Sequence, residues 1–281
     1  MKLSIIICSR TAEINPILLS NIDETIGVDY ELILIDNSKN KYSIFEAYNL
    51  GINRSKGDYW CFIHDDILFH NNDWGKIVED IFVQNPKIGL IGVAGAKIKT
   101  KMPSAWWDCP EDLKALNIMQ HLKSGEVEHW EKGWIKKTEE VAAIDGVFMA
   151  ARRSDEIQFS NILTGFHNYD LNLSFEYLRH NYKIAATKEI LIEHFSIGTI
   201  NSSWYESVIK IHDMYSDILP LQLNGESDFN LKKLEFDNGA KFLLESFNHI
   251  KKIHLIKIWL RLLLLKPKSK LHLKFFKMLL R

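Results

Sequence analysis

The sequence has few cysteines and prolines, and it contains no low-complexity segment. Its three cysteines, Cys8, Cys61 and Cys109, are odd in number and widely spaced. They fit neither a disulfide framework nor a zinc site, so a reducing cytoplasm is the expected compartment. The six prolines leave little room for disorder. With 281 residues, 46% hydrophobic and 25% charged, the chain is expected to form one large globular domain, with or without an appendage.

The ends of the chain also lack long apolar runs. The N-terminal "MKLSIIICSR" has one Lys and no cleavage site after its short apolar run, which predicts a first β-strand and not a signal peptide. Near the other end, the longest uncharged run in residues 251–281 is Leu262 to Leu265. Because about 20 apolar residues are needed to cross a bilayer, this segment is not expected to span one.

Charge is distributed unevenly along the chain. Residues 251–281 contain ten Lys or Arg and no Asp or Glu, whereas the other 250 residues carry 25 basic and 36 acidic side chains. Basic residues at intervals among Leu, Ile, Trp and Phe predict a pair of interfacial helices, broken near Pro267, that bind an anionic membrane surface. The alternative is a helix that packs on the rest of the protein and exposes a solvated basic face.

The first ninety residues alternate between strand and helix patterns. The runs "LSIIIC", "ELILIDN" and "YWCFIHDD" have no helical period and are typical of strands covered on both faces. Helices are predicted at 15–26, at 43–52, where Ser43 and Glu46 form a capping box, and from about Asp73, a plausible N-cap, to Pro86. This order predicts an α/β fold with a parallel sheet.

The later sequence is less regular. Residues 100–140 are tryptophan-rich and receive no assignment. A single strand is expected at 141–152, a helix at 171–181, strands at 182–187 and 190–198, and helices after about Trp204. Acidic residues and a histidine follow the predicted strands at the edge where such sheets bind ligands: Asp36, Asp65, Asp66, Asp145, Asp170 and His194. So much negative charge is costly without a cation, which favours Mg²⁺ or, with a histidine present, Mn²⁺.

The order of these motifs resembles glycosyltransferase family 2, which has the GT-A fold. The matching segments extend from residue 3 to about residue 200: "IIICSR", "ILIDNS", "AYNLGINRSKGDYWCFIHDD", "IDGVFMAARR", "FHNYDLNLSFEYLRHNYKI" and "IEHFSIG". The His-x-Asp form of the metal motif resembles a bacterial subgroup of that family. The resemblance implies a Rossmann-like, mixed and mostly parallel sheet flanked by helices over residues 1–220. A helical C-terminal extension with a basic amphipathic tail follows at 221–281.

The resemblance also implies roles for individual residues. Asp170 matches the general base. Asp66 matches the metal-binding aspartate, with His64 and His194 as further ligands. The nucleotide is expected to contact Ser9, Arg10, Asp36, Asn49 and Asp65. The sugar and acceptor pocket is expected to include Asp145, Gly146, Trp106, Trp107 and His167. Tyr169 stands where the family often has glutamate, and Asn172 where a second aspartate often lies.

These roles imply a metal-dependent, inverting glycosyltransferase of the hexosyltransferase type, in which a base deprotonates the attacking acceptor hydroxyl. The expected donor is a nucleotide-diphospho-sugar, UDP-linked, and the expected cofactor is Mn²⁺ or Mg²⁺. The acceptor would be a glycan or lipid-linked molecule in bacterial polysaccharide or glycoconjugate biosynthesis. No nucleic-acid partner is expected. The protein would be cytoplasmic and peripheral on the inner face of the plasma membrane.

Two other classes stay open. The same Asp and His residues could serve a metal-dependent phosphohydrolase, although the sequence shows no clear ligand pair for a second metal. A degenerate transferase fold could act as a nucleotide- or glycan-binding scaffold, although both Asp66 and Asp170 are present. Each residue also has a structural reading: Asp36 in a turn, Asp170 as a helix cap, Asp145 at a bulge, and His194 and the tryptophans in the core.

Overall fold

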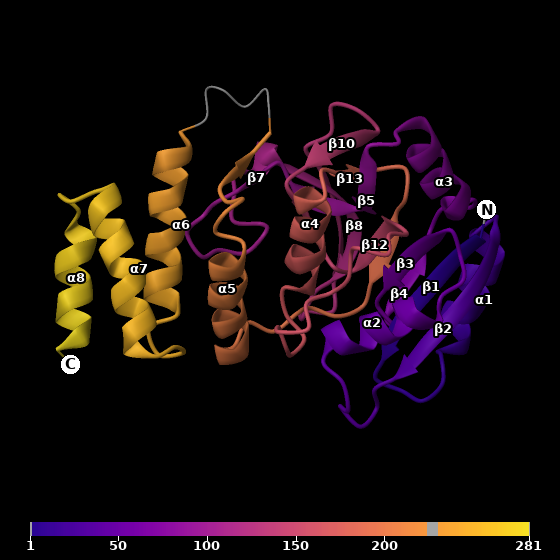
Figure 1. Cartoon of the computed structure of the whole chain (residues 1–281), viewed down its shortest axis with the longest axis horizontal. Coiled ribbons are helices and arrows are strands. Elements are labelled where there is room, and N and C mark those ends of the chain that lie inside the picture. The colour runs from indigo at the N-terminus through magenta and orange to yellow at the C-terminus, as the bar shows by residue number, and fades with distance from the viewer. Residues whose placement is uncertain (1, 224–229, 281) are drawn as a thin grey trace.

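The computed structural model describes residues 2–223 and 230–280. A sheet-containing part lies toward the N-terminal end of the molecule, and a row of helices extends from it toward the C-terminal end (Figure 1). The expectation of an α/β architecture holds, because helices flank a central mixed sheet. The division at residues 220 and 221 stays a prediction.

The N-terminal strands and helices form as the sequence predicts. Strand β1 (Lys2–Ser9) lies between β2 (Asp29–Asp36) and β3 (Tyr59–Ile63), parallel to both. Helix α1 (Pro16–Thr25) connects β1 to β2, and α2 (Ile44–Arg54) connects β2 to β3. The predicted capping box of α2 is confirmed, since the Ser43 hydroxyl accepts from the Glu46 amide and the Glu46 carboxylate accepts from the Ser43 amide.

A seven-stranded mixed sheet has the order β10-β13-β5-β12-β3-β1-β2. The further strands are β5 (Ile88–Gly92), β10 (Thr138–Val141), β12 (Phe148–Arg152) and β13 (Lys183–Thr187). Alternate residues of β1 enter different cores. Ile6 packs with α2 and with α4 (Tyr169–Arg179), whereas Ile5 and Ile7 pack with α1 and with α3 (Trp74–Gln84). The sheet is therefore covered by helices on both faces.

A second sheet has the order β11-β6-β8-β14-β4, with β9 paired to β8. Its strands are β4 (Ile67–Phe69), β6 (Ala94–Ala96), β8 (Lys114–His121), β9 (Val127–Lys132), β11 (Ala143–Ile144) and β14 (Ile192–His194). The unassigned 100–140 region thus contains a β-hairpin and a short 3₁₀ helix (Glu111–Leu113). The sequence concealed the hairpin because β9 is mostly exposed and charged on both faces.

One local prediction is wrong, and another holds only in part. The expected strand at 141–152 is divided among the end of β10, β11 and β12. The break between β11 and β12 is a turn, in which the Asp145 carboxylate accepts a hydrogen bond from the Val147 amide. Asp73 occupies the predicted N-cap position of α3, but its side chain makes no capping hydrogen bond. It has a left-handed backbone, and its carboxylate binds the Lys76 ammonium instead.

The C-terminal residues are mainly helical, as expected. Helices α5 (Ser202–Met214), α6 (Leu231–Glu245), α7 (Lys252–Leu265) and α8 (Lys270–Leu279) share a core that includes Val208, Phe242, Leu262 and Phe275. One short strand, β15 (Leu221–Gln222), pairs with β7 (Ile98–Lys99). Within the described residues, every helix is too short or too polar to cross a bilayer.

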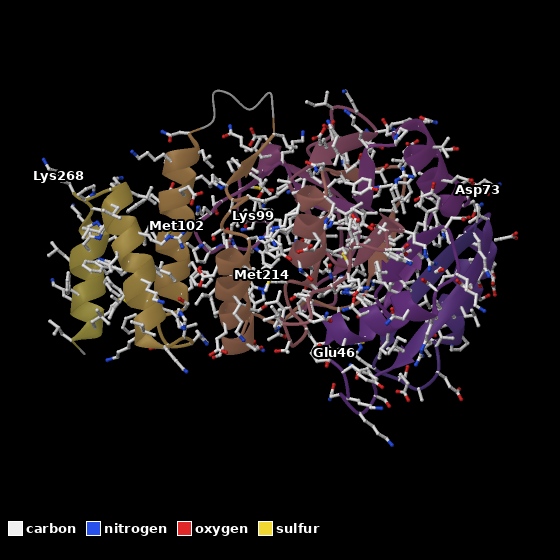
Figure 2. All side chains as sticks on the ribbon, in the orientation of Figure 1. Glu46, Asp73, Lys99, Met102, Met214 and Lys268 are labelled. Atoms are coloured by element: carbon white, nitrogen blue, oxygen red, sulfur yellow. The ribbon has the colours of Figure 1, made fainter. Side chains whose placement is uncertain are left out.

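The loop between β7 and the 3₁₀ helix is held by the C-terminal helices. Met102 is buried in their core (Figure 2). The buried carboxylate of Glu235 on α6 accepts hydrogen bonds from the amides of Lys101 and Met102, at 2.6 and 2.7 Å. Lys241 forms an ion pair with Asp108 at 2.7 Å. Because this loop carries Trp106 and Trp107, the helices fix one wall of the site described next.

Candidate active site

The first group of site residues lies where the parallel strands end. Strand β3 ends at Ile63, so His64, Asp65 and Asp66 follow at the carboxyl edge, beside Ser9 at the end of β1. Asp36 ends β2 opposite Ser9. Its exposed carboxylate accepts a hydrogen bond from the Ser38 amide, which lowers the pKa of Asp36. The structure therefore brings most of the expected donor-binding residues to one edge.

Asp65 is bound to the end of β1. Its carboxylate accepts from the Arg10 amide at 2.9 Å, from the Arg10 guanidinium at 2.7 Å and from the Ser9 hydroxyl at 3.3 Å. Burial opposes ionisation of Asp65, but these hydrogen bonds and the Arg10 charge outweigh burial and hold the pKa of Asp65 below its usual range. Asp65 thus joins two strand ends and stays a carboxylate.

Asn49, a further residue expected to contact the nucleotide, makes its hydrogen bonds to another part of the fold. It lies on α2, where its side-chain amide donates to the Phe159 carbonyl at 2.8 Å and accepts from the Phe159 amide at 3.0 Å. The side chain ties α2 to the segment that follows β12. Its polar atoms are therefore engaged in holding the fold together.

His64, Asp66 and His194 form a cluster that could hold a metal ion. One ligand atom from each residue lies within 4.8 Å of the others, and the described residues contain no second group of this kind. Asp66 Oδ1 is 3.8 Å from His64 Nδ1 and 3.6 Å from His194 Nε2. The antiparallel pairing of β14 with β4, which aligns His194 with Ile67, brings His194 beside Asp66.

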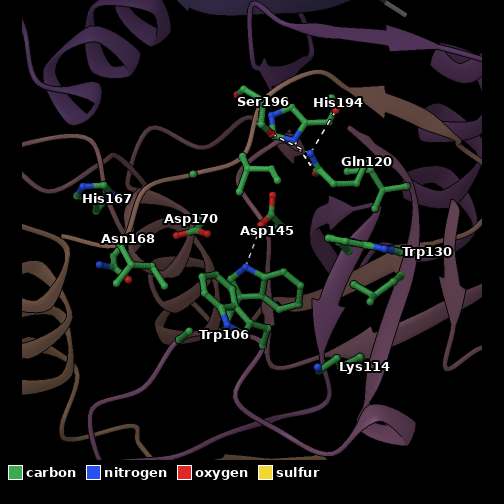
Figure 3. Close-up of a pocket in the computed structure, with 18 of the residues that line it drawn as sticks. Trp106, Lys114, Gln120, Trp130, Asp145, His167, Asn168, Asp170, His194 and Ser196 are labelled. Carbon is green, nitrogen blue, oxygen red and sulfur yellow. Dashed lines mark hydrogen bonds between the residues drawn. The ribbon is translucent and has the colours of Figure 1, made fainter. Parts of the chain in front are cut away.

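The hydrogen bonds around His194 fix its tautomer. Gln120 Nε2 donates hydrogen bonds to three backbone carbonyls, so the Gln120 Oε1 atom must be an acceptor. This oxygen accepts a hydrogen bond from His194 Nδ1 at 3.0 Å (Figure 3). Burial, and next the nearby His64, lower the pKa of His194. His194 Nε2 therefore presents a lone pair toward Asp66, as a metal ligand requires.

His64 is oriented by Tyr169, a residue that the sequence did not single out as functional. The Tyr169 hydroxyl lies 2.6 Å from His64 Nε2. If this nitrogen donates its proton to Tyr169, His64 Nδ1 also presents a lone pair to the same point. The predicted residue Gly146 makes room for the ring, because a Cβ there would lie 2.4 Å from the Tyr169 oxygen. The sequence did contain a signal for Tyr169, since it directly precedes Asp170, the residue expected to act as the general base.

The two histidines and the carboxylate fit a divalent cation. Nitrogen and oxygen donors from three residues converge, and each histidine has a hydrogen-bond partner on its other nitrogen. Imidazole ligands favour Mn²⁺ over Mg²⁺, which prefers an all-oxygen shell.

A cavity of about 560 Å³ opens beside this cluster. His194 lies at one side, and the expected residues Trp106, Trp107, Asp145, His167 and Asp170 all line it (Figure 3). Trp106 Nε1 donates to Asp145 at 2.9 Å, and Trp107 stacks on Trp204 of α5. Trp130, from the tryptophan-rich 100–140 region, also lines the cavity. So do Trp204, Lys114 and Lys132, to which no sequence pattern had pointed.

Asp170 lies in the first turn of α4, facing the cavity beside Asp145 (Figure 3). Burial, and next the charge of Asp145, raise the pKa of Asp170 to about 7, although the Leu171 amide donates to it. It is not the N-cap, a position held by Asn168. A carboxyl group that gains and loses its proton near neutral pH suits a general base.

The family model described as "Glycosyltransferase like family" matches residues 4–214. No curated protein matches the chain.

Two structures of S. aureus TarS residues 1–349 are similar. The one in complex with UDP-GlcNAc is 12% identical with a TM-score of 0.52, and its alignment covers 88% of this chain and 73% of TarS. The one in complex with UDP is 13% identical with a TM-score of 0.51, covering 88% and 72%. At this identity the likeness concerns the fold, and it confirms the GT-A prediction.

Asp170→Asn is expected to stabilise the protein at higher pH. The unfolded carboxyl has a pKa of about 3.9, whereas burial raises the folded pKa to about 7. The folded state therefore binds more protons between these values, and the wild type loses stability as pH rises through that window. The variant lacks this loss, so urea unfolding should show a gain on the order of 2 kcal/mol at pH 8 and much less at pH 4. The exposed Asp155→Asn is the control, and an equal pH dependence in both variants would contradict the burial of Asp170.

Proposed function

The chain belongs to the glycosyltransferase-like family, and from this premise we propose that it transfers a sugar from a UDP-sugar to an acceptor hydroxyl, with inversion of the anomeric configuration. The observation that carries the proposal is the shared cavity. This cavity is lined both by Asp170, whose pKa of about 7 suits a base at neutral pH, and by His194, which belongs to the candidate metal cluster. A donor held at the cluster would thus present its sugar toward the base.

The donor would bind along the carboxyl edge of β1, β2 and β3. Asp36, which ends β2 opposite Ser9, would contact the base and ribose, and the hydrogen-bonded Ser9 and Asp65 would lie beneath them. The Arg10 guanidinium is largely exposed and lies 3.1 Å from Asp66, so it can turn to the diphosphate. The UDP-GlcNAc and UDP complexes of TarS support the choice of a uridine donor.

His64, Asp66 and His194 would hold the divalent cation, Mn²⁺ in preference to Mg²⁺. When bound, the cation supplies neutralisation of the negative charge that develops on the leaving nucleotide diphosphate. Gln120 and Tyr169 keep the two imidazoles oriented for this purpose. Arg10, which lies beside Asp66, would add a further positive charge on the same side.

The acceptor would enter the tryptophan-lined cavity. The Asp170 carboxylate accepts the proton of the acceptor hydroxyl as its oxygen attacks the anomeric carbon, and the nucleotide diphosphate leaves from the opposite face. Burial is the main cause of the raised Asp170 pKa, and the charge of Asp145, which is held by the Trp106 indole and the Val147 amide, adds to it. Trp106 and Trp130 offer apolar ring faces to a sugar.

The phosphohydrolase alternative receives less support, because the described residues supply one candidate metal cluster and not two. We assign the transfer to bacterial polysaccharide or glycoconjugate synthesis on the cytoplasmic side of the membrane, with a glycan or lipid-linked acceptor. The scaffold alternative predicts nucleotide binding without turnover.

Calorimetric titration with UDP, GDP, CDP and TDP, in Mn²⁺ and then in chelator, tests the donor site. We expect selective, Mn²⁺-dependent binding of UDP, and loss of that dependence in Asp66→Ala, because the cluster loses its carboxylate. Asp112→Ala, which removes an exposed carboxylate elsewhere, is the control. Absence of binding by every nucleotide would refute the transferase proposal.

Asp170→Asn is expected to bind UDP normally and to lose transfer by about 10²–10⁴-fold, since an amide cannot accept the proton. In the wild type, kcat/KM should rise with pH through about 7, as Asp170 becomes a carboxylate. Release of UDP from the UDP-sugar, with and without a panel of glycans, measures both. Sugar release that is equally fast without any glycan would favour a hydrolase, and a retained configuration in the product would exclude single displacement.

Tyr169→Phe is expected to weaken Mn²⁺ binding by about 10–100-fold, because His64 loses the partner that orients it. Tyr48→Phe is a matched control, since Tyr48 is also buried and its ring lies 5.7 Å from that of Tyr169. Calorimetry with Mn²⁺ alone measures the effect. Equal affinities of the two variants would show that Tyr169 does not orient His64.

A further inference from the structure

Helix α7 is apolar on two opposite sides. Leu255, Ile258 and Leu262 are buried in the C-terminal core. On the other side, side chains three or four residues apart form one exposed stripe: Ile253 at 54%, Ile256 at 37%, Leu260 at 47% and Leu264 at 83% relative exposure. A helix that only packed on the protein would place polar residues along this second side.

Helix α8 repeats the pattern. His272 and Phe275 are buried, whereas Leu273, Phe276 and Leu280 are 69%, 47% and 87% exposed and lie at the same helical spacing. Trp259 of α7 stacks on Phe275 and contacts Phe276 edge-on, so the two helices pack together at the end of the molecule (Figure 1). The exposed stripes are named here the α7 stripe (Ile253, Ile256, Leu260, Leu264) and the α8 stripe (Leu273, Phe276, Leu280).

Positive charge surrounds both stripes. Lys257 lies within the α7 stripe, and Lys270, Lys274 and Lys277 lie beside the α8 stripe. Within the described part of residues 251–281, none of the lysines forms an ion pair with a carboxylate of this chain. Lys257, Lys270, Lys274 and Lys277 are exposed and are therefore available to an external partner.

We propose that the α7 and α8 stripes dock on an anionic lipid bilayer, with both helices lying in the headgroup region. Leucine, isoleucine and phenylalanine side chains would enter the acyl boundary, and the lysines would bind lipid phosphates. A second copy of this chain on the same face is disfavoured, because it would bring two uncompensated basic segments together. This inference goes beyond the transfer chemistry and does not rest on it.

The C-terminal helices also contact the loop that forms one wall of the cavity. Glu235 and Lys241 of α6 hold the loop that carries Trp106 and Trp107, and Arg261 of α7 donates to the Lys101 carbonyl at 3.1 Å. Helix α7 thus contacts the loop that forms the cavity wall directly, and α8 is joined to α7 through the packing of Trp259 on Phe275. Docking would hold the cavity near the membrane surface, where lipid-linked molecules are found.

The test is co-sedimentation of the full chain with vesicles of phosphatidylcholine alone or mixed with phosphatidylglycerol. We expect binding to the anionic vesicles that weakens as salt is raised. Leu264→Gln combined with Leu273→Gln should reduce it at least about 10-fold, because both residues would leave the acyl boundary. Ile135→Gln combined with Ile162→Gln is the matched control, since these residues are 86% and 80% exposed outside the C-terminal helices.

Three outcomes would overturn the proposal. The first is a wild type that does not bind anionic vesicles, and the second is an equal loss in the control variant. The third is a dimer, seen by sedimentation velocity without vesicles, that the Leu264 and Leu273 substitutions dissociate, which would assign the stripes to a second copy. Circular dichroism of each variant checks that the exposed substitutions leave the fold intact.

Discussion

The pairing of β14 with β4 is the contact on which the candidate site depends. It aligns His194 with Ile67, so an imidazole from one part of the chain lies against Asp66 from another. A shift of one residue in this register would turn His194 to the opposite face of the sheet. Pairing of β14 with β8 on its other edge fixes the same register and places Gln120 beside His194.

Environment, and not residue type, separates the roles of the carboxylates. The Asp65 carboxylate accepts hydrogen bonds from Arg10 and Ser9, which lower its pKa and keep it ionised. Asp66 faces two imidazoles and suits a cation. Asp170 lies in a cavity with Asp145 nearby, which raises its pKa to about 7 and suits proton transfer. Three aspartates thus acquire three different chemistries from what surrounds them.

The C-terminal helices contribute to the site although they supply few of its residues. Trp204 of α5 lines the cavity and stacks on Trp107. Glu235 of α6 satisfies two buried backbone amides of the loop that carries Trp106, and unpaired buried amides would be costly. The segment after residue 220 is therefore coupled to the tryptophan-lined side of the cavity, whatever the boundary between the two parts.

Local rules explain what the sequence by itself determined. The strand and helix order, the Ser43 cap and the placement of acidic residues at strand ends all follow from patterns within about ten residues, and the structure has them. The exposed β-hairpin at 114–132, the turn at Asp145, the Phe159 contacts of Asn49 and the Tyr169–His64 hydrogen bond depend on partners distant in the chain. Such pairings are set by packing and by satisfaction of buried polar groups, so only the tertiary structure decided them.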